Sequence, residues 1–360
     1  MEKVKLPPLF HEDPDLSDYL HRHEEYWVDT PGISKRVNVF VSHYGLVSKW
    51  GFLDRNCMPN LFPENDIAHY WKFQKEVALQ ELVCRFGTSL KTRTLDADHD
   101  YVLIHHKWFG YAFWMTCFLP RLLRVLDTPE IKKRKLLVSK RWVNFPYVQE
   151  SLKVVQIDLE VLDLDEHVFV PHLILPHARK ASSYFYSSEI RKIRAFFYSK
   201  YNLPAENVAP FRKVWIHRSE KGKRAIENEQ EVLQVASKSG FEAIVLEDLA
   251  LKEQVELLSQ TKILAGLHGA GLANAVFLPE GAKLLEFIPN AFAAYGHPFT
   301  FRALAFAAGI GYGVSGIKSG VLFPWTEAKK KNAEIRLGLI NSNQEFCLEK
   351  LKRAVEAIAT

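Results

Sequence analysis

The residues best suited to chemistry lie at positions 262–274, in the run KILAGLHGAGLAN. An apolar strand leads there into a turn with glycines at 266, 269 and 271 and a histidine at 268. Glycine lets the backbone turn sharply and approach a ligand closely, and the N–H groups of a helix start attract anions. The turn therefore favours a phosphate group as its ligand. A tight connection that binds nothing has the same composition, so the turn alone does not decide.

The elements after this turn extend the pattern to half of a nucleotide-binding fold. Residues 277–281 predict a loop, and Lys283–Pro289 predicts a buried strand that carries one acid, Glu286. Strand, turn, helix and strand in this order form a Rossmann-like half, in which Glu286 stands where ribose hydroxyls usually find an acceptor. The glycine spacing differs from G-x-G-x-x-G, which disfavours a nicotinamide cofactor.

A second loop suited to anions follows the strand expected at residues 213–216. Its sequence, HRSEKGKR at positions 217–224, places several cations at the carboxyl end of a strand. Open α/β sheets bind ligands at that edge, and Arg218 and Arg224 can each fork onto phosphate oxygens. A solvated basic loop is the alternative. Two such loops in one half-domain favour phosphate binding.

Strands and helices alternate along the chain, which predicts an α/β fold to position these loops. Ordered structure is expected from about Val37, and the two prolines within residues 171–181 suggest a boundary near residue 180. The predicted domains are residues 1–180 and 181–340, each Rossmann-like, with a closing helix in 341–360. The expected strands are 37–41, 101–104, 136–138, 154–157, 213–216, 243–246, 262–267 and 283–289, and the expected helices are 108–126, 189–201, 227–239, 251–261 and 345–359.

The composition excludes several other classes of protein. A chain of 360 residues that is 48% apolar supports two packed domains. The four cysteines form no C-x-x-C pair, so neither a zinc site nor a disulfide framework is indicated, and a reducing compartment fits best. No signal-peptide core and no apolar stretch of roughly 20 residues is found, so a soluble, cytoplasmic protein is expected.

The charge pattern bears on partners. A net charge of +5 suits phosphorylated ligands or peripheral contact with the inner face of an anionic membrane. The basic clusters at 132–135 and 329–331 are typical of solvated helix faces, with no interleaved aromatic residues. Nucleic acid is therefore not expected as a partner.

The ordered series of residues around the two loops resembles glycosyltransferase family 61. The series within residues 213–290 is Arg218, Arg224, Asn228-Glu229, Gly240-Phe241, Glu247, Glu253-Gln254, His268-Gly269-Ala270-Gly271-Leu272, Asn274, Glu286 and Pro289. A weaker match, Tyr111, Trp114 and Leu119-Pro120-Arg121-Leu122, resembles the family's N-terminal helix. The resemblance implies a GT-B architecture, in which two Rossmann-like domains face a cleft, and inverting transfer from a nucleotide sugar, usually a UDP-sugar.

The resemblance also implies roles for single residues. Arg218 and Arg224 would clamp the diphosphate. The backbone of Gly269, Ala270 and Gly271 would complete its cradle, and His268 would touch the phosphate or the sugar. Glu286 would hold the ribose. Glu247 would lie near the nucleobase or ribose, unless it is only an exposed acid at a helix start. Asn274 either touches the ligand or braces the turn, and Glu229 and Gln254 would hold the loops.

One departure from the family pattern concerns the catalytic base. Members often carry a histidine before the aromatic at Trp114 and an acid three residues before Pro120, where this chain has Phe113 and Cys117. An inverting transfer needs a group that takes the proton of the acceptor hydroxyl. The nearest replacements flank the strand expected at 101–104, with Asp100 before it and His105 and His106 after it. Structural histidines are the alternative, so the base stays undetermined.

No metal ion or other cofactor is expected. The D-x-D pairs at 96–98 and 163–165 lie in the other half of the chain from the donor turn and are typical of solvated turns. Arginines offer a metal-free way to stabilise a departing diphosphate. The protein is therefore predicted to work without a divalent cation.

The favoured function is an inverting glycosyltransferase that moves a sugar from a UDP-sugar to a glycan hydroxyl. The acceptor would be a glycan, glycolipid or glycoprotein in the assembly of cell-surface polysaccharide, lipopolysaccharide or protein-linked glycan. Phe113 and Cys117 motivate an alternative, a catalytically silent member that binds a nucleotide sugar and assembles with another transferase. A generic module that binds anions or nucleic acid is a third hypothesis. It predicts steep salt dependence of polyanion binding and no preference for UDP over other nucleotides.

Overall fold

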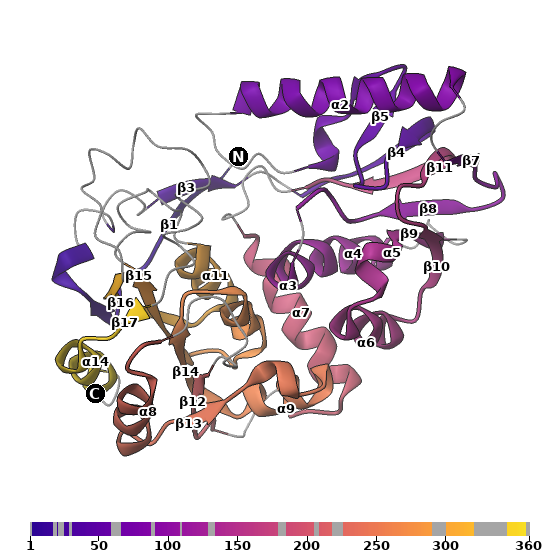
Figure 1. Cartoon of the computed structure of the whole chain (residues 1–360). Helices are drawn as coiled ribbons and strands as arrows, with labels where there is room; N and C mark the ends of the chain where they lie inside the picture. Colours follow the sequence, from indigo (N-terminus) through magenta and orange to yellow (C-terminus); the bar gives the residue numbers. More distant parts are fainter. Residues whose placement is uncertain are drawn as a thin grey trace. The chain divides into compact units, whose positions relative to one another are not determined.

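The computed structural model divides the chain into two compact units (Figure 1). Unit 1 comprises residues 1–2 and 27–200, and unit 2 comprises residues 3–26 and 201–360. The structure describes residues 2–16, 20, 25–28, 31–58, 66–87, 91–108, 110–128, 134–178, 185–204, 209–217, 226–289, 300–319 and 344–357. The α/β class predicted from the sequence is confirmed. No described helix is long and apolar enough to cross a bilayer.

Unit 1 is built on a mixed sheet in the order β10-β9-β8-β11-β4-β5-β6, with β7 beside β11. Neighbouring strands from β10 to β11 are parallel, and β4, β5 and β6 continue the sheet antiparallel. The strands are β4 (Ile33–Val41), β5 (Val47–Lys49), β6 (Phe52–Leu53), β7 (Thr92–Thr94), β8 (Asp100–Leu103), β9 (Arg134–Ser139), β10 (Asp158–Leu162) and β11 (His167–Pro176). Strands β1 (Glu2–Lys5) and β3 (Glu25–Val28) pair separately.

Helices cover both faces of this sheet. Helix α2 (Asp66–Phe86) lies on one face, over β5 and β6, and the helices from α3 to α7 lie on the other (Figure 1). The latter are α3 (Tyr111–Phe113), η4 (Trp114–Phe118), α4 (Leu119–Leu126), α5 (Lys140–Val143), α6 (Pro146–Val155) and α7 (Ser187–Lys200), and η2 (Arg55–Cys57) follows β6. Pro120 has no N–H for the carbonyl four residues back and its ring crowds that turn. Segment η4 accordingly widens to a π-helix, in which the Leu119 N–H donates to the Trp114 carbonyl.

Unit 2 is built on a sheet whose five central strands are parallel, in the order β13-β12-β14-β15-β16. In chain order these are the second, first, third, fourth and fifth strands, so the direction of winding reverses between β12 and β14. The strands are β12 (Arg212–Ile216), β13 (Glu242–Ile244), β14 (Thr261–Leu267), β15 (Lys283–Pro289), β16 (Gly311–Ser319) and the antiparallel β17 (Gln344–Glu345). The helices are α8 (Glu229–Lys238), η5 (Leu246–Asp248), α9 (Leu251–Ser259), η6 (Ala270–Phe277), α11 (Thr300–Ala308) and α14 (Leu348–Glu356). This confirms the predicted β-α-β-α-β order and the closing helix.

The N-terminal segment joins unit 2, so the expectation of ordered structure only from Val37 is wrong. Strand β2 (His11–Glu12) pairs with β16, and the buried Asp13 accepts the Gly316 N–H at 2.9 Å. A Cβ added to Gly313 would lie 2.5 Å from the Phe10 ring. Short polar, proline-punctuated segments carry no strong pattern of their own. Their order comes from pairing with a sheet edge 303 residues away in sequence.

Two further expectations are corrected. The domain boundary expected near residue 180 falls instead at 200/201. The first part of the stretch 171–181 belongs to β11, which continues to Pro176. Pro171 is tolerated because it stands opposite Asn38, which has a positive φ of 52° and skips one pairing with β11. The strand expected at 154–157 is instead the end of α6, since Val148, Leu152 and Val155 bury one helical face. Strand β10 begins only at Asp158.

Candidate functional site

The site in unit 2 is organised by the point where the strand order reverses. Ile216, the last residue of β12, is paired with Gly266 near the end of β14. The chain therefore leaves β12 at His217 and β14 at His268 from adjacent strands, on the same edge of the sheet. Ligands of open α/β sheets bind in the crevice outside the carboxyl ends of two such strands. The structure thus brings the beginnings of both predicted loops together.

One of the glycines in the turn has a packing reason. A Cβ added to Gly266 would lie 3.1 Å from the Ile216 Cβ, whereas one added to Gly271 would lie at an ordinary 3.4 Å from the Ile216 Cγ2. The end of β12 therefore needs position 266 to be small. Gly269 has an extended backbone with φ of 169°, Gly271 is half-buried and Ala270 is exposed. Of the three predicted cradle positions, Ala270 is the one most open to a ligand.

His268 is held by a buried polar chain. Its Nδ1 faces Oε1 of Glu286, and the Tyr312 hydroxyl donates to Oε2 of the same carboxylate. Glu286 is only 1% exposed. Tyr312 is paired with Leu284 across β15 and β16, which places it diagonally beside Glu286 on the same face.

This arrangement revises the expected role of Glu286. A carboxylate that is enclosed and bonded through both oxygens orients the histidine and does not present itself to a ribose. Because Nδ1 faces the carboxylate, Nε2 is the ring nitrogen on the far side. The edge of the Phe301 ring, 5.3 Å away between centroids, further restricts the imidazole. Tyr312 was not predicted, because the glycine-rich sequence of β16 carries no signal for it.

The remaining donor-side residues divide into braces and exposed groups. The buried Asn274 donates to the Gly271 carbonyl at 3.1 Å, which favours its role as a brace of the turn. The buried Gln254 donates to the carbonyls of Leu246 and Leu249, at 2.9 and 3.0 Å, and so holds the segment that carries Glu247. Glu247 itself is exposed after β13. The predicted loop-holding role of Gln254 is confirmed.

The basic loop is described only at its root. Arg218 and Arg224 lie outside the described residues. His217, directly before Arg218, donates its backbone N–H to the Ile244 carbonyl at 2.9 Å. Its Nδ1 lies 3.2 Å from Oε1 of Glu229, at the start of α8. Glu229 therefore lies within ion-pairing distance of the root of the loop.

Of the three candidate bases of unit 1, Asp100 lies apart from the two histidines. Asp100 begins β8, whereas His105 and His106 follow its last residue, so roughly 16 Å separates Asp100 from His105 at about 3.3 Å per residue. His105 is fully buried, and burial together with the nearby Arg121 lowers its pKa to about 3. Such an enclosed, weakly basic imidazole is poorly suited to take a proton from an acceptor.

His106 lies beside Phe113, the position at which this chain departs from the family pattern. Its ring lies 5.5 Å from that of Phe113 and 4.7 Å from that of Phe118, between centroids, and it is 2% exposed. Phe113 is the residue that replaces the histidine common in the family. An imidazole is thus still present beside this position, although it comes from the end of β8. Cys117, the replacement for the acid, is buried in the π-helix.

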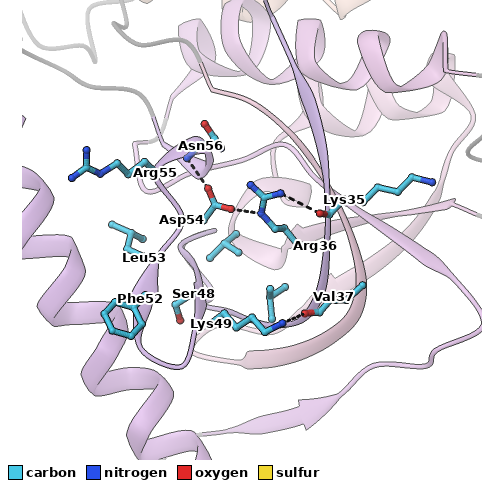
Figure 2. Close-up of a pocket in the computed structure, with 12 residues that line it drawn as sticks. Lys35, Arg36, Val37, Ser48, Lys49, Phe52, Leu53, Asp54, Arg55 and Asn56 are labelled. Atoms are coloured by element: carbon cyan, nitrogen blue, oxygen red, sulfur yellow. Dashed lines mark hydrogen bonds and ion pairs between the residues drawn. The ribbon is translucent and has the colours of Figure 1, made fainter.

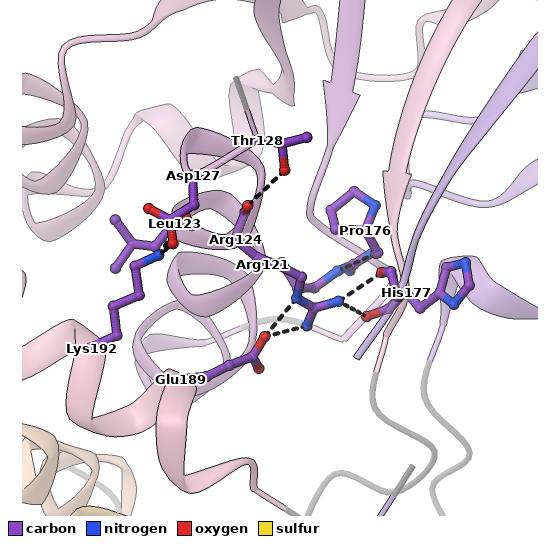
Figure 3. Close-up of polar contacts among 10 residues, drawn as sticks. Arg121, Leu123, Arg124, Asp127, Thr128, Pro176, His177, Glu189 and Lys192 are labelled. Carbon is purple, nitrogen blue, oxygen red and sulfur yellow. Dashed lines mark hydrogen bonds and ion pairs between the residues drawn. The ribbon is translucent and has the colours of Figure 1, made fainter. Parts of the chain in front are cut away.

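The family motif at 119–122 has a structural role here. Arg121 is buried, and its Nε donates to the Pro176 carbonyl at 2.8 Å (Figure 3). Its guanidinium also donates to the Ile104 carbonyl, and so Arg121 holds the ends of β8 and β11 together. One turn later, Arg124 donates to Glu189 of α7 at 2.6 Å. These arginines fasten α4 to the sheet and to α7.

Metal-ligating side chains do not gather within the described ranges. No group of three or more His, Cys, Asp or Glu residues there is arranged to hold an ion. Asp96 accepts the Asp98 N–H at 2.9 Å in an exposed turn, and Asp163 pairs with Lys140 at 3.0 Å. Both D-x-D pairs are therefore engaged in surface turns.

Comparisons with known proteins agree with this site. The family model described as Glycosyltransferase 61 matches residues 111–285, from the start of α3 into β15. The match covers both the Arg121 motif and the His268 turn, and it identifies the class as glycosyltransferases. This match confirms the resemblance to glycosyltransferase family 61 seen in the sequence.

Curated relatives match over shorter stretches. Protein O-linked-mannose beta-1,4-N-acetylglucosaminyltransferase 2 of Canis lupus familiaris is 32% identical over 122 residues, 33% of this chain and 21% of that protein. The Xenopus laevis protein of the same name is 34% identical over 121 residues, 32% and 20% of the two chains. Alpha-1,3-arabinosyltransferase XAT3 of Oryza sativa subsp. japonica is 34% identical over 65 residues, 17% and 11%. The match thus spans about a fifth of the length of the first two relatives.

Proposed function

We propose that the protein is an inverting glycosyltransferase that transfers a sugar from a UDP-sugar to a glycan hydroxyl. The observation that carries the proposal is the juxtaposition of His217 and His268 on one sheet edge, at the reversal of strand order in unit 2. The basic loop and the glycine-rich turn both start there. Relatives named as N-acetylglucosaminyl- and arabinosyltransferases support a nucleotide-sugar donor and a glycan acceptor.

In this proposal unit 2 binds the donor. Arg218 and Arg224 neutralise the diphosphate as it departs with negative charge, and the exposed backbone at Ala270 contributes to the cradle. His268, oriented by Glu286, contacts the phosphate or the sugar through Nε2. Unit 1 would bind the acceptor, in a GT-B arrangement of the two units. A divalent cation is not required in this scheme.

The acceptor hydroxyl needs a proton acceptor, and we assign His106 as the first residue to test. It is the only one of the three candidates whose ring is shown against Phe113. Substitution His106→Gln should lower kcat by about 100-fold, whereas His105→Gln should act mainly through stability, because burial and Arg121 lower the pKa of His105 to about 3. Equal losses of kcat in both variants at equal folded fractions would remove this assignment.

Binding of nucleotides tests the donor site directly. Calorimetric titration with UDP, GDP and CDP, with and without magnesium, should show binding that is selective for UDP and independent of the metal. Arg218→Ala should abolish this binding with folding intact, because the diphosphate loses a bidentate partner. Exposed Lys238→Gln on α8 is the matched charge control. Absence of nucleotide binding would contradict the transferase proposal. Loss of turnover in EDTA would contradict the proposal that no divalent cation is required.

A catalytically silent member is the second candidate, and it rests on Phe113 and Cys117. Phe113 is only half-buried, so Phe113→His is tolerable there, whereas an acid at the buried Cys117 would cost several kcal/mol. If Phe113→His creates sugar-transfer activity that the native protein lacks, the hypothesis of a catalytically silent member is favoured. Hydrolysis of a UDP-sugar by the native protein speaks against it. A cytoplasmic setting, and a part in cell-surface polysaccharide, lipopolysaccharide or protein-glycan assembly, remain proposals.

A further inference from the structure

Exposed large apolar side chains concentrate in one part of unit 1. Of the eleven such side chains in the described ranges, seven lie between positions 37 and 86. They are Val37, Trp50, Phe52, Trp71, Leu79, Leu82 and Phe86. Single exposed apolar residues are normal, but a contiguous patch marks an interaction surface.

Helix α2 contributes the larger part of this patch. Trp71, Leu79, Leu82 and Phe86 are separated by eight, three and four residues, so they form one stripe along the helix. The opposite side buries Phe73, Val77 and Cys84 against the sheet. The stripe, which we call the outer face of α2, is therefore not needed to form the core of unit 1.

The turn between β5 and β6 adds two aromatic side chains beside this face. Trp50 and Phe52 are 70% and 76% exposed. The turn is fixed to α2, because the N–H groups of Trp50 and Gly51 donate to Glu81 at 3.0 and 2.8 Å. The Arg85 guanidinium lies 4.5 Å from the Trp50 ring centroid. The aromatic side chains are thus presented on a rigid base.

A basic pocket adjoins the turn (Figure 2). It has a volume of about 500 Å³ and lies where β5 ends and leaves part of β4 unpaired on that side. Its charged lining consists of the cations Lys35, Arg36, Lys49 and Arg55 and the acid Asp54. Val37 and Phe52 line it as well, so the pocket and the apolar patch are continuous.

The charge of this region is positive because its acids are already paired. Residues 31–58 and 66–87 carry seven Lys and Arg side chains and four Asp and Glu side chains. Three of the acids form ion pairs, Asp54 with Arg36 at 2.6 Å, Glu76 with Lys107 at 2.5 Å and Glu81 with Arg85 at 2.8 Å. Within the ranges that the structure describes, Lys35, Lys49, Arg55, Lys72 and Lys75 take part in no ion pair.

We propose that this surface docks the protein on an anionic phospholipid bilayer. The outer face of α2 and the turn carrying Trp50 and Phe52 would enter the headgroup region, and the basic pocket would hold one anionic headgroup. Aromatic and leucine side chains beside lysines and arginines are the composition of helices that lie in a membrane interface, because their apolar parts bury while the charged ends stay wet. The inference stands independently of the transferase activity.

A bilayer fits this surface better than a protein partner does. The apolar side chains stand on a helix ridge and a turn tip, not in a groove. A second copy would bring the same excess of cations against this one, and like charges oppose such pairing. Anionic lipids neutralise those cations, and the attraction should weaken with salt.

Vesicle sedimentation tests the proposal with the full chain. The protein should sediment with vesicles of phosphatidylcholine and phosphatidylglycerol and stay in solution with phosphatidylcholine alone. Trp71→Ser with Phe86→Ser should weaken binding at least about tenfold through lost insertion. Lys49→Gln with Arg55→Gln should weaken it about fivefold per cation, and 0.5 M salt should have a similar effect.

Matched controls lie in unit 2. Phe211→Ser replaces an exposed aromatic residue, and Lys238→Gln with Lys252→Gln removes two exposed cations. These variants should bind vesicles like the wild type, and circular dichroism with thermal unfolding checks that all variants are folded. The proposal fails if anionic vesicles do not bind the protein or if the outer-face variant binds unchanged. It also fails if analytical ultracentrifugation shows a dimer that Trp71→Ser with Phe86→Ser dissociates.

Discussion

The two regions that carry the family signature use it differently. In unit 2 the motif residues contact one another, with His268 bonded to Glu286 and Asn274 bonded to the turn beside it. In unit 1 the motif residue Arg121 donates to the backbone carbonyls of Ile104 and Pro176, and it fastens strand ends together. One region therefore shapes the proposed ligand site, and the other holds its own sheet and helices together. A shared signature does not imply a shared kind of role.

The largest expected effect concerns the scaffold role of Arg121. Arg121→Gln should lower the free energy of unfolding by roughly 3–5 kcal/mol, because buried carbonyls of Ile104 and Pro176 lose a charged donor. Urea unfolding measures this, with exposed Lys153→Gln as the control at about 0.5 kcal/mol or less. Unchanged stability with lost transfer would show that Arg121 acts on a ligand and would break the contrast between the regions.

A pH dependence should distinguish the buried histidines of unit 1. Burial, with His43 nearby, lowers the pKa of His167 to about 4 from an unfolded value of 6.5. Between these values the unfolded chain binds the proton and the folded one does not, so stability is full above pH 6.5 and falls as the pH drops towards 4. The slope should be about 1.4 kcal/mol per pH unit.

Replacing the histidine tests the sign of this effect. His167→Gln should flatten the acid side of the stability curve by that slope, whereas exposed His172→Gln should leave the curve unchanged. Chemical denaturation at pH 7, 6 and 5 provides the measurement. A slope that is the same in both variants would contradict the assignment to His167.

The glycines of the turn offer a matched pair. Gly266→Ala places a Cβ 3.1 Å from Ile216 and should cost about 1–3 kcal/mol of stability. Gly271→Ala meets the same residue at 3.4 Å, an ordinary contact, and should cost less than about 1 kcal/mol. If Gly271→Ala keeps stability but loses UDP binding, the turn acts as a cradle. If both variants bind UDP normally, the glycines serve packing alone.

The smallest effect is expected from the hydroxyl that supports Glu286. Tyr312→Phe should cost about 1 kcal/mol, the net contribution of one hydrogen bond. A double-mutant cycle with Glu286→Gln should give a coupling energy of the same order, measured by thermal unfolding and by UDP affinity. Additive effects would show that Tyr312 and Glu286 act separately. In that case the interpretation of His268, Glu286 and Tyr312 as one connected polar chain would be wrong.

Much of unit 2 was predictable from its sequence. Strand β15 was predicted residue for residue, and α8 and α9 within about two residues at each end. Buried strands and amphipathic helices can be predicted in this way because each has a characteristic spacing of apolar residues along the sequence. The glycine turn after β14 followed from local backbone requirements. In unit 1 the period was ambiguous at 154–157, where a run of apolar residues suits a strand or a helix end alike.

The sequence by itself determined the alternating elements, the exits of the two loops from their strands and the resemblance to a glycosyltransferase family. These depend on near neighbours along the chain and on residue types. Tertiary structure alone decided that Glu286 bridges His268 and Tyr312, that His106 lies against Phe113, and that the first residues complete unit 2. Each of these contacts depends on which distant segments of the chain pack side by side. Burial and sheet register select those segments, so the local sequence pattern around one residue does not predict its contact partner.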